Sequence, residues 1–474
     1  MKKERIKDFV LIVLVISSLF LTGKIWFNEN LWPEGFNLFS AIESKVASWF
    51  APQQEQQAQS ALAPMHLVAY TIKDSDHASI ALTDANEHFK TVESFCNLTI
   101  SDAVAQPQEN IAAVDEEAWK NALFNNGLFI DYGSDIPSSI FTSLLSGNEQ
   151  SALGTVCTDV RYVILTAEGN VVSDISVYIK SSNGACVKIT TTRPKKELTD
   201  TLALLNDYVS PTNRFSFFIG ADTATGDMGE VLFHPYMLLT ENETALSGIQ
   251  PQNPVYKAEA SIDQSKLERL LRYFNINPKT AKRYTDAEEN TVFLQNQATL
   301  KISKSGLIEY TVAAGGKGLA LSEQSNPSIS TLSRNGTTLA NDVYSIFTDT
   351  PSNLYLNTFT EQDGQYALGM DYRISGTKVV TDLENGHAVE LEIKDGYVKK
   401  FTILLRKYAP STNTYTLPST YAAVDKMFTN ISNTTPNTMI ENMFIGYYDN
   451  GTDGEIKPLW FVKLEGESQR KIQE

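Results

Sequence analysis

The sequence feature that most constrains the fold is an uncharged apolar run near the N-terminus, Phe9–Gly23 (FVLIVLVISSLFLTG). After Lys24 the apolar residues continue through Ile25, Trp26 and Phe27. A helix over residues 9–27 would be about 28 Å long, because each residue adds about 1.5 Å, and the hydrocarbon core of a bilayer is about 30 Å thick. The run therefore predicts one transmembrane helix over residues 9–27.

The residues that flank this run predict its orientation. Four basic side chains precede it and outnumber two acidic ones: Lys2, Lys3, Arg5 and Lys7 against Glu4 and Asp8. The positive-inside rule then places residues 1–8 in the cytoplasm as a short tail and everything after Lys24 outside. The alternative is a cleaved signal peptide. We favour an uncleaved anchor, because Leu21-Thr22-Gly23 lacks the small residues at alternate positions that a signal peptidase prefers.

Composition narrows the classes of partner. The chain has 474 residues, of which 42% are hydrophobic, enough for more than one globular core. Its 56 Asp and Glu residues exceed its 39 Lys and Arg residues, which gives a formal net charge of −17. This charge repels polyphosphate, and no basic stripe is present, so nucleic acid is not expected as a partner. Three cysteines are too few for a disulfide scaffold, and the sequence leaves open whether Cys157 and Cys186 pair.

Residues 28–65 connect the predicted anchor to the exterior part of the chain. Their first half repeats apolar residues at helical spacing: Phe36, Phe39, Ile42, Val46, Trp49 and Phe50. This pattern predicts a juxtamembrane helix that lies on the membrane or packs on the main body, and a partner-binding helix is the alternative. The Gln- and Ala-rich segment Ala51–Pro64 follows and is typical of a stalk.

The exterior part is predicted to hold three α+β domains, at residues 66–252, 253–326 and 327–474, although the boundary between the last two stays open. Beyond the first boundary a helix followed by hairpins recurs, and Leu300–Tyr310 and Leu391–Phe401 are alike in pattern. We therefore expect the α+β fold class. A single N-terminal transmembrane helix should precede a multidomain extracytoplasmic region of antiparallel sheets, each covered by helices.

Two local signals specify parts of this fold. Ser265 and Glu268 have the spacing of a capping box and predict the start of a helix that ends before Pro278. Asp395-Gly396 predicts a two-residue turn between two strands.

The sequence contains no catalytic or metal-binding motif. It lacks a G-x-S-x-G elbow, an H-E-x-x-H helix, a P-loop and a Rossmann glycine run. Cys96 and His88 share a helix face only roughly, and His66, His77 and His88 do not have the spacing of metal ligands. The loop Asp449–Glu455 resembles a calcium loop in composition, but a hairpin turn explains it better. No catalytic residue, metal ligand or cofactor is therefore predicted, and we expect a protein that is not an enzyme.

Lys3-Glu4-Arg5-Ile6-Lys7 near one end of the chain and Tyr447-Tyr448 near the other resemble segments of the YycH family. At the N-terminus the resemblance is carried by Lys3-Glu4-Arg5-Ile6-Lys7, Leu14-Val15, Ser18-Leu19, Leu21-Thr22 and Trp26. At the other end, Tyr447-Tyr448 and Lys457-Pro458-Leu459-Trp460 resemble the closing strands of this family and of PepSY-like modules. Members of the family are single-span exported regulators of the cell-wall sensor histidine kinase YycG, also called WalK, and their partner protein is YycI.

The resemblance implies a regulator in the cell membrane, with its N-terminus in the cytoplasm and its body outside. The implied partners are the membrane, a YycG/WalK-type kinase and a YycI-like protein. Membrane helices associate through small and hydroxylated side chains, so we expect partner contact along one stripe: Leu14, Ser18, Leu21, Thr22 and Ile25. The alternative is that Ser18 and Thr22 bond only to carbonyls of their own helix. The sign of regulation, the exterior ligand and the oligomeric state stay open.

Two other functions remain as alternatives. The first is an exported solute- or peptide-binding protein of the cell envelope, which would need a concave pocket between the body at 66–240 and the units after it. The second is an envelope enzyme with an unfamiliar active site.

Overall fold

The computed structural model describes residues 62–472, apart from 74–75, 83–85, 148–150, 168–173, 209–212, 216–231, 257–260, 323, 325–326, 375, 384, 431–438 and 467–468. Among the described residues, no helix is both long and apolar enough to cross a membrane. The predicted transmembrane helix at 9–27 lies outside them, so it stays a prediction. The described part contains seven α-helices and mainly antiparallel strands, which confirms the α+β class.

The N-terminal part of the described chain is a seven-stranded antiparallel sheet in the order β2-β1-β4-β5-β6-β7-β3. Its strands are β1 (His66–Lys73), β2 (Asp76–Leu82), β3 (Ile111–Val114), β4 (Gly127–Pro137), β5 (Asp159–Thr166), β6 (Asp174–Lys180) and β7 (Cys186–Pro194). Its helices are α3 (Phe89–Val104), α4 (Glu116–Leu123), α5 (Ser138–Ser146) and α6 (Lys195–Ala203).

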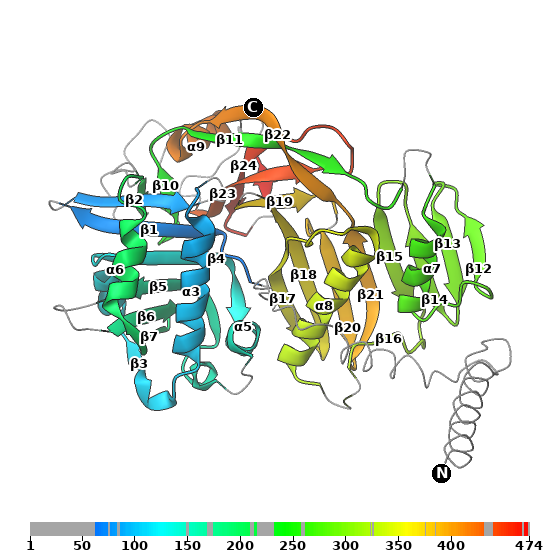
Figure 1. Cartoon of the computed structure of the whole chain (residues 1–474), viewed down its shortest axis with the longest axis horizontal. Coiled ribbons are helices and arrows are strands. Elements are labelled where there is room, and N and C mark those ends of the chain that lie inside the picture. The colour runs from blue at the N-terminus through cyan, green and yellow to red at the C-terminus, as the bar shows by residue number, and fades with distance from the viewer. Residues whose placement is uncertain are drawn as a thin grey trace, which may run out of the picture. The chain divides into compact units, whose positions relative to one another are not determined.

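Helices cover both faces of this sheet. Leu67 and Ala69 of β1 share a core with residues of α3, α5 and α6, whereas Val68 and Tyr70 share another core with α4. This division follows from the strand geometry, because successive side chains point to opposite faces. Figure 1 shows α3 and α6 running across the strands of one face. The buried runs of β4, β5 and β6 are therefore apolar on both sides, as a sheet between two helical layers requires.

The C-terminal part is a 14-stranded sheet with the main path β12-β13-β14-β15-β21-β20-β18-β19-β23-β24-β25. Its strands up to the middle of the path are β12 (Lys282–Thr285), β13 (Thr291–Gln295), β14 (Ala298–Ile302), β15 (Leu307–Val312), β21 (Tyr397–Leu404) and β20 (Val389–Lys394). The others are β18 (Gln365–Ile374), β19 (Thr377–Thr381), β23 (Met439–Asp449), β24 (Pro458–Leu464) and β25 (Arg470–Lys471). Off the path, β16 (Leu319–Ala320) pairs with β21, β17 (Leu354–Gln362) with β18, and β9 (Leu232–Phe233) with β23.

Two similar hairpins meet in this sheet through β15 and β21. Leu300 pairs with Tyr310 in the first hairpin, and Leu391 pairs with Phe401, at the equivalent positions, in the second. Tyr310 in turn pairs with Phe401 across the junction of β15 and β21. Equivalent residues therefore lie opposite each other, as in a local two-fold arrangement. The two segments that are alike in the sequence thus form one continuous surface.

One helix from each unit packs on this surface. Phe274, directly after α7 (Gln264–Tyr273), stacks on Tyr310 with ring centroids 4.8 Å apart and lies 5.6 Å from Phe401. On α8 (Ile329–Phe347), a Cβ added at Gly336 would lie 3.1 Å from the side chain of Leu368 on β18. The missing side chain thus lets α8 approach the sheet closely.

The two local signals of the sequence have different outcomes. The Asp395-Gly396 turn is confirmed, because both residues have positive φ, 53° and 77°, between β20 and β21. The capping-box prediction is wrong. The N-cap of α7 is Asp263, whose carboxylate accepts hydrogen bonds from the N–H groups of Ser265 and Lys266, so Ser265 lies inside the helix. Asp caps a helix as well as Ser does, and it comes first in the chain.

A two-stranded ribbon follows the N-terminal part and returns later in the chain. β11 (Thr244–Gln252) pairs with β22 (Lys407–Leu417), and β10 (Leu238–Thr240) pairs with β8 (Asn213–Phe215). From α9 (Thr420–Asn430), Val424 and Met427 share a core with Trp460 and Val462 of β24. The domain boundaries at residues 252 and 326 stay predictions.

The cysteines are free thiols in the core: Cys96, Cys157 and Cys186. Burial raises the pKa of Cys157 to about 11, and burial also raises the pKa values of Cys96 and Cys186. Cys157 and Cys186, whose pairing the sequence left open, are therefore not joined in this structure.

We predict that Phe274→Ala lowers the free energy of unfolding by about 3–5 kcal/mol, because it leaves a cavity under Tyr310 and Phe401 at the centre of the two units. Urea unfolding followed by circular dichroism measures the change. Leu98→Ala is the control, since the Leu98 side chain is 55% exposed and should contribute less than about 0.5 kcal/mol. Equal effects of the two variants would contradict the proposed importance of this aromatic contact.

Candidate functional site

A buried carboxylate on β18, Asp371, is the centre of a group of charged side chains. Its Oδ2 lies 2.8 Å from Nζ of Lys378 on β19, and its Oδ1 lies 3.0 Å from Nδ1 of His387, just before β20. The side chain of Asp371 has no exposed surface, and those of Lys378 and His387 are 9% and 13% exposed. The pairing of β18 with both β19 and β20 brings the three residues together. We call Asp371, Lys378 and His387 the ionic anchor.

The negative charge of Asp371 is balanced by the side chains beside it. Burial by itself would raise the pKa of Asp371, because it disfavours the charged form. The Lys378 ammonium and the His387 ring outweigh burial and lower the pKa to about 2. Asp371 is therefore ionised throughout the physiological range, and its two neighbours are held at its oxygens.

His387 continues the hydrogen-bond chain to a fourth residue. Its Nε2 lies 3.0 Å from Oγ1 of Thr358 on β17. With its proton on Nδ1, toward Asp371, the ring accepts a hydrogen bond from the Thr358 hydroxyl. A Cβ added at Gly369 would overlap both the Thr358 hydroxyl and the His387 ring, so only glycine permits this contact. The chain therefore links β17, β18, β19 and the residues before β20.

The order hydroxyl, imidazole, carboxylate is also that of a hydrolytic triad. Two features of this group differ from such a site. Lys378 shares the carboxylate of Asp371, which weakens the support that the carboxylate gives to a protonated imidazole. The Thr358 hydroxyl and the His387 ring also lie against the main chain at Gly369, which occupies that side of the pair. The arrangement fits a structural anchor better than a nucleophile.

Three contacts join the N-terminal part to strands β17 and β18 of the 14-stranded sheet and to the helix α8. Arg373 of β18 binds Glu93 of α3 at 3.0 Å, and its guanidinium lies 4.8 Å from the centre of the Phe89 ring. The Ser134 hydroxyl of β4 donates to the main-chain carbonyl of Asn357 in β17. The third contact joins Arg334 of α8 to the Ser143 hydroxyl of α5, at 2.5 Å. We call these three pairs the junction.

Arg373 of the junction and Asp371 of the ionic anchor share one face of β18. Asp371 and Arg373 are two residues apart on the strand, so their side chains point to the same side. Met370 and Tyr372 point to the other side and lie in the core with residues of α8. A displacement of α3 against β18 would therefore move Arg373 directly. It would also affect Asp371 of the ionic anchor, which lies two residues away on the same strand.

A second buried charge, Arg406, binds carboxylates at the end of β23 and in the loop that follows. The Arg406 side chain has no exposed surface, and it lies 3.4 Å from Asp449 and 2.9 Å from Asp453. The Tyr408 hydroxyl donates to the same Asp449 carboxylate at 2.7 Å. The segment that resembled a calcium loop is thus a hairpin loop between β23 and β24, as favoured from the sequence, and Arg406 binds its carboxylates.

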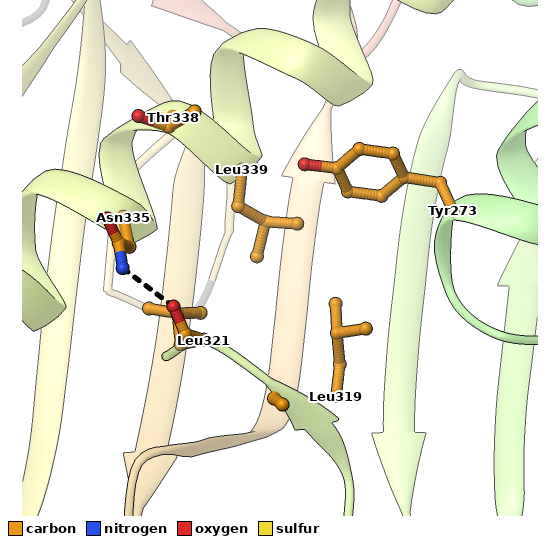
Figure 2. A pocket seen from close by; sticks show the side chains of 7 residues that line it. Tyr273, Leu319, Leu321, Asn335, Thr338 and Leu339 are labelled. Atoms are coloured by element: carbon orange, nitrogen blue, oxygen red, sulfur yellow. Dashed lines mark hydrogen bonds between the residues drawn. The ribbon is translucent and has the colours of Figure 1, made fainter. Parts of the chain in front are cut away.

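A cleft of about 270 Å³ lies between α7, β16 and α8 (Figure 2). It is lined by Tyr273, Leu319, Ala320, Leu321, Asn335, Thr338 and Leu339. The Asn335 amide donates to the Leu321 carbonyl at 2.7 Å, and the Tyr273 hydroxyl donates to Asp342 at 2.8 Å. These polar groups are thus already bound within the protein. The cleft is also smaller than the roughly 300–1,000 Å³ of ordinary ligand sites, so it gives little support to a small-molecule function.

The partner-contact stripe predicted from the sequence lies outside the described residues: Leu14, Ser18, Leu21, Thr22 and Ile25. The ionic anchor and the junction were not anticipated. Their residues come from segments far apart in the chain, and each is an ordinary polar residue of a strand or helix. The only local signal is the alternation of the charged residues Asp371 and Arg373 with Met370 and Tyr372 in β18.

Comparison with known proteins identifies the N-terminal part. Residues 4–206 match the family model described as "YycH protein, N-terminal domain". No curated protein matches the chain at a significant level. Among solved structures, the Bacillus megaterium YpeB C-terminal domain matches with 12% identity over 45% of this chain and 99% of that chain, at a TM-score of 0.24. A likeness at this TM-score carries no argument about fold or function.

The matched family is a class of regulators associated with a two-component signalling system. On this match residues 4–206 are similar to the N-terminal domain of the YycH family, whose members act in general on the YycG/WalK system.

We predict that Asp371→Asn lowers the free energy of unfolding by about 3–5 kcal/mol at neutral pH, because it leaves the Lys378 ammonium buried without its counter-charge. Urea unfolding measures this change. Adding Lys378→Met should restore much of the loss, since the double variant buries no unpaired charge. A single variant as stable as the wild type would show that the pair contributes nothing.

The same carboxylate predicts a pH dependence. The pKa of Asp371 is about 2 in the folded protein and about 3.9 in an unfolded chain. Its contribution is therefore present above about pH 4 and is lost as the pH falls toward 2. Asp371→Asn should lack this part of the acid transition.

For the junction we predict a coupling energy of about 1–2 kcal/mol between Glu93 and Arg373. A double-mutant cycle with Glu93→Gln and Arg373→Met, measured by urea unfolding, gives this value. The control cycle uses Glu441 and Lys463, whose side chains are 31% and 43% exposed, and it should give less than about 1 kcal/mol. A junction value at or below that of the control pair would mean that α3 and β18 are not held by this contact.

Proposed function

We propose that this chain is a non-enzymatic, membrane-anchored regulator that modulates a sensor histidine kinase of the YycG/WalK type. It acts through transmembrane and extracytoplasmic contacts, together with a YycI-like protein. The observation that carries the proposal is the match of residues 4–206 to the YycH N-terminal domain, which covers both the apolar N-terminal run and the first exterior sheet. The proposed location is the cell membrane, with the N-terminus in the cytoplasm.

The proposed mechanism is a bias on the membrane helices of the kinase. A kinase of this kind changes activity when its own helices shift, and a neighbouring helix favours the state against which it packs better. On the predicted helix, Ser18 and Thr22 lie one turn apart and share a stripe with the other predicted contact residues. Small and hydroxylated side chains permit close packing and hydrogen bonds between helices in lipid. The stripe is therefore the proposed contact with the kinase.

The exterior part would contact partner proteins on the outer side of the membrane. The tail and predicted anchor are positively charged, so the acidic residues that give the net charge of −17 lie mainly in the exterior part. This charge disfavours direct binding to anionic polymers or lipids and favours protein partners with complementary surfaces. The cleft between α7 and α8 is not the concave pocket between body and later units that a solute-binding function would need.

We predict that the double variant Ser18→Leu, Thr22→Leu changes the output of the kinase severalfold while abundance and membrane localisation stay normal, because it removes two hydroxyl groups from the contact stripe. A transcriptional reporter of the two-component system measures output. Ser17→Leu is the control, since it replaces a hydroxyl group by a bulky apolar side chain beside the stripe rather than on it. Unchanged output in the double variant would count against helix contact.

A second measurement tests the anchor itself. A topology reporter fused after Trp26 should be active only outside the cytoplasm, in a protein that stays with the membrane. A protein that begins at His66 and is exported on a cleavable signal should lose regulation. Full regulation by this soluble form would overturn the membrane-anchored mechanism.

A further inference from the structure

The first strand of the 14-stranded sheet has a free edge. β12 begins the strand path and pairs only with β13 among the described strands. All four of its residues are exposed: Lys282, Arg283, Tyr284 and Thr285. The backbone N–H and C=O groups on the far side of such a strand are available to another strand, as is typical of sheet edges.

Apolar side chains lie beside this edge on the face that α7 does not cover. In the antiparallel register, Lys282 lies opposite Leu294 and Tyr284 lies opposite Val292, so these four residues share a face. Phe293 points the other way, into the core beneath α7. Tyr284 is 44% exposed and Leu294 is 40% exposed, which is high for large apolar side chains in this structure. The edge thus combines a free backbone with an exposed apolar surface.

The edge also carries positive charge that the surrounding residues do not neutralise. Lys279, Lys282 and Arg283 are exposed, and among the described residues none of the three takes part in an ion pair. The acidic loop that follows is already occupied: Asp286 and Glu288 bind Lys301, and Glu289 binds Lys304. A chain with net charge −17 therefore has a local cluster of cations at an open strand edge.

We propose that β12 is a docking edge for an extended, carboxylate-bearing segment of a partner protein, which adds as a new strand beside Lys282–Thr285. Backbone hydrogen bonds would supply the pairing, as in other cases of strand addition. Carboxylates on the segment would lie near Lys282 and Arg283, and an apolar residue opposite Tyr284 would contact its ring. The inference rests on the proposed function, because it names the surface through which that regulator binds a partner.

A second copy of this chain is a poorer occupant of the same edge. Antiparallel pairing of two β12 strands would gather the Lys282 and Arg283 side chains of both copies along one short ribbon. Like charges on neighbouring strands destabilise pairing. The same cations that disfavour self-association favour an acidic strand, so the charge of the edge selects a different partner protein.

The experiment uses the full-length chain in membranes, co-expressed with the sensor kinase and the YycI-like regulator of the same cell. The variant Lys282→Glu, Arg283→Glu reverses both charges of the edge. Its matched control is Lys90→Glu, Lys196→Glu, which makes the same change of net charge at exposed positions of α3 and α6. We expect the edge variant to co-purify about tenfold less of one of the two partners, and the control to co-purify as much as the wild type. Urea unfolding checks that both variants fold.

A photo-crosslinking residue in place of Thr285 gives an independent measurement. It should form a covalent product with the same partner that the edge variant loses, and this product should be lost when both edge charges are reversed. The same residue at Asp200, which is exposed on α6, should give no such product.

The outcomes separate the two proposals. If the wild type co-purifies neither partner, the proposed function fails. If the wild type binds but the edge variant binds equally well, the function stands and the docking edge is wrong. If Thr285 crosslinks only to a second copy, or the edge variant changes only the mass measured by light scattering, the occupant is this chain itself and the proposal is overturned.

Discussion

The pairing of β15 with β21 is the contact that holds the C-terminal part in one piece. It joins two helix-and-hairpin units whose residues are distant in the chain, from Leu307 opposite Leu404 to Thr311 opposite Lys400. Without this pairing, Phe274 would lose its contact with Phe401, and each unit would expose another free edge. The cleft between α7 and α8 exists only because the two units lie in one sheet. The position of β12 at the outer end of the strand path follows from the same pairing.

Buried charges hold the rest of the sheet in register. Asp371 and Arg406 have no exposed side-chain surface, and each is bound by residues from other strands or loops. A buried ion pair adds little net stability over an apolar pair, but breaking it is costly, so it penalises every alternative pairing of the strands. The ionic anchor lies on the face of β18 that also carries Arg373, which binds the N-terminal part. Together with the contact between Arg373 and Glu93, these pairs define one relative arrangement of β18 and α3.

Much of the fold could be predicted from the sequence because its signals are local. A helix that ends before Pro278 was predicted where α7 lies, and Asp395-Gly396 indicated the hairpin turn, since both signals depend on neighbouring residues. The predicted start of α7 at Ser265 was wrong, because Asp263 and Ser265 are both good N-cap residues and the sequence pattern alone does not rank them. The ionic anchor and the junction could not be predicted, because the contact of Asp371 with His387 or of Arg373 with Glu93 depends on which strands become neighbours. The contact stripe on the predicted transmembrane helix is inferred from the sequence alone and stays a prediction.

The burial of all three thiols has a consequence for biogenesis. Cys96, Cys157 and Cys186 lie in cores with raised pKa values, so almost no thiolate is present at neutral pH to exchange with other sulfur compounds. Once folded, the chain neither needs an oxidase to complete its structure nor risks scrambling in an oxidising compartment. The folded structure is therefore insensitive to the redox state of its surroundings, and reaction of these sulfurs with an alkylating reagent would report loss of the native core.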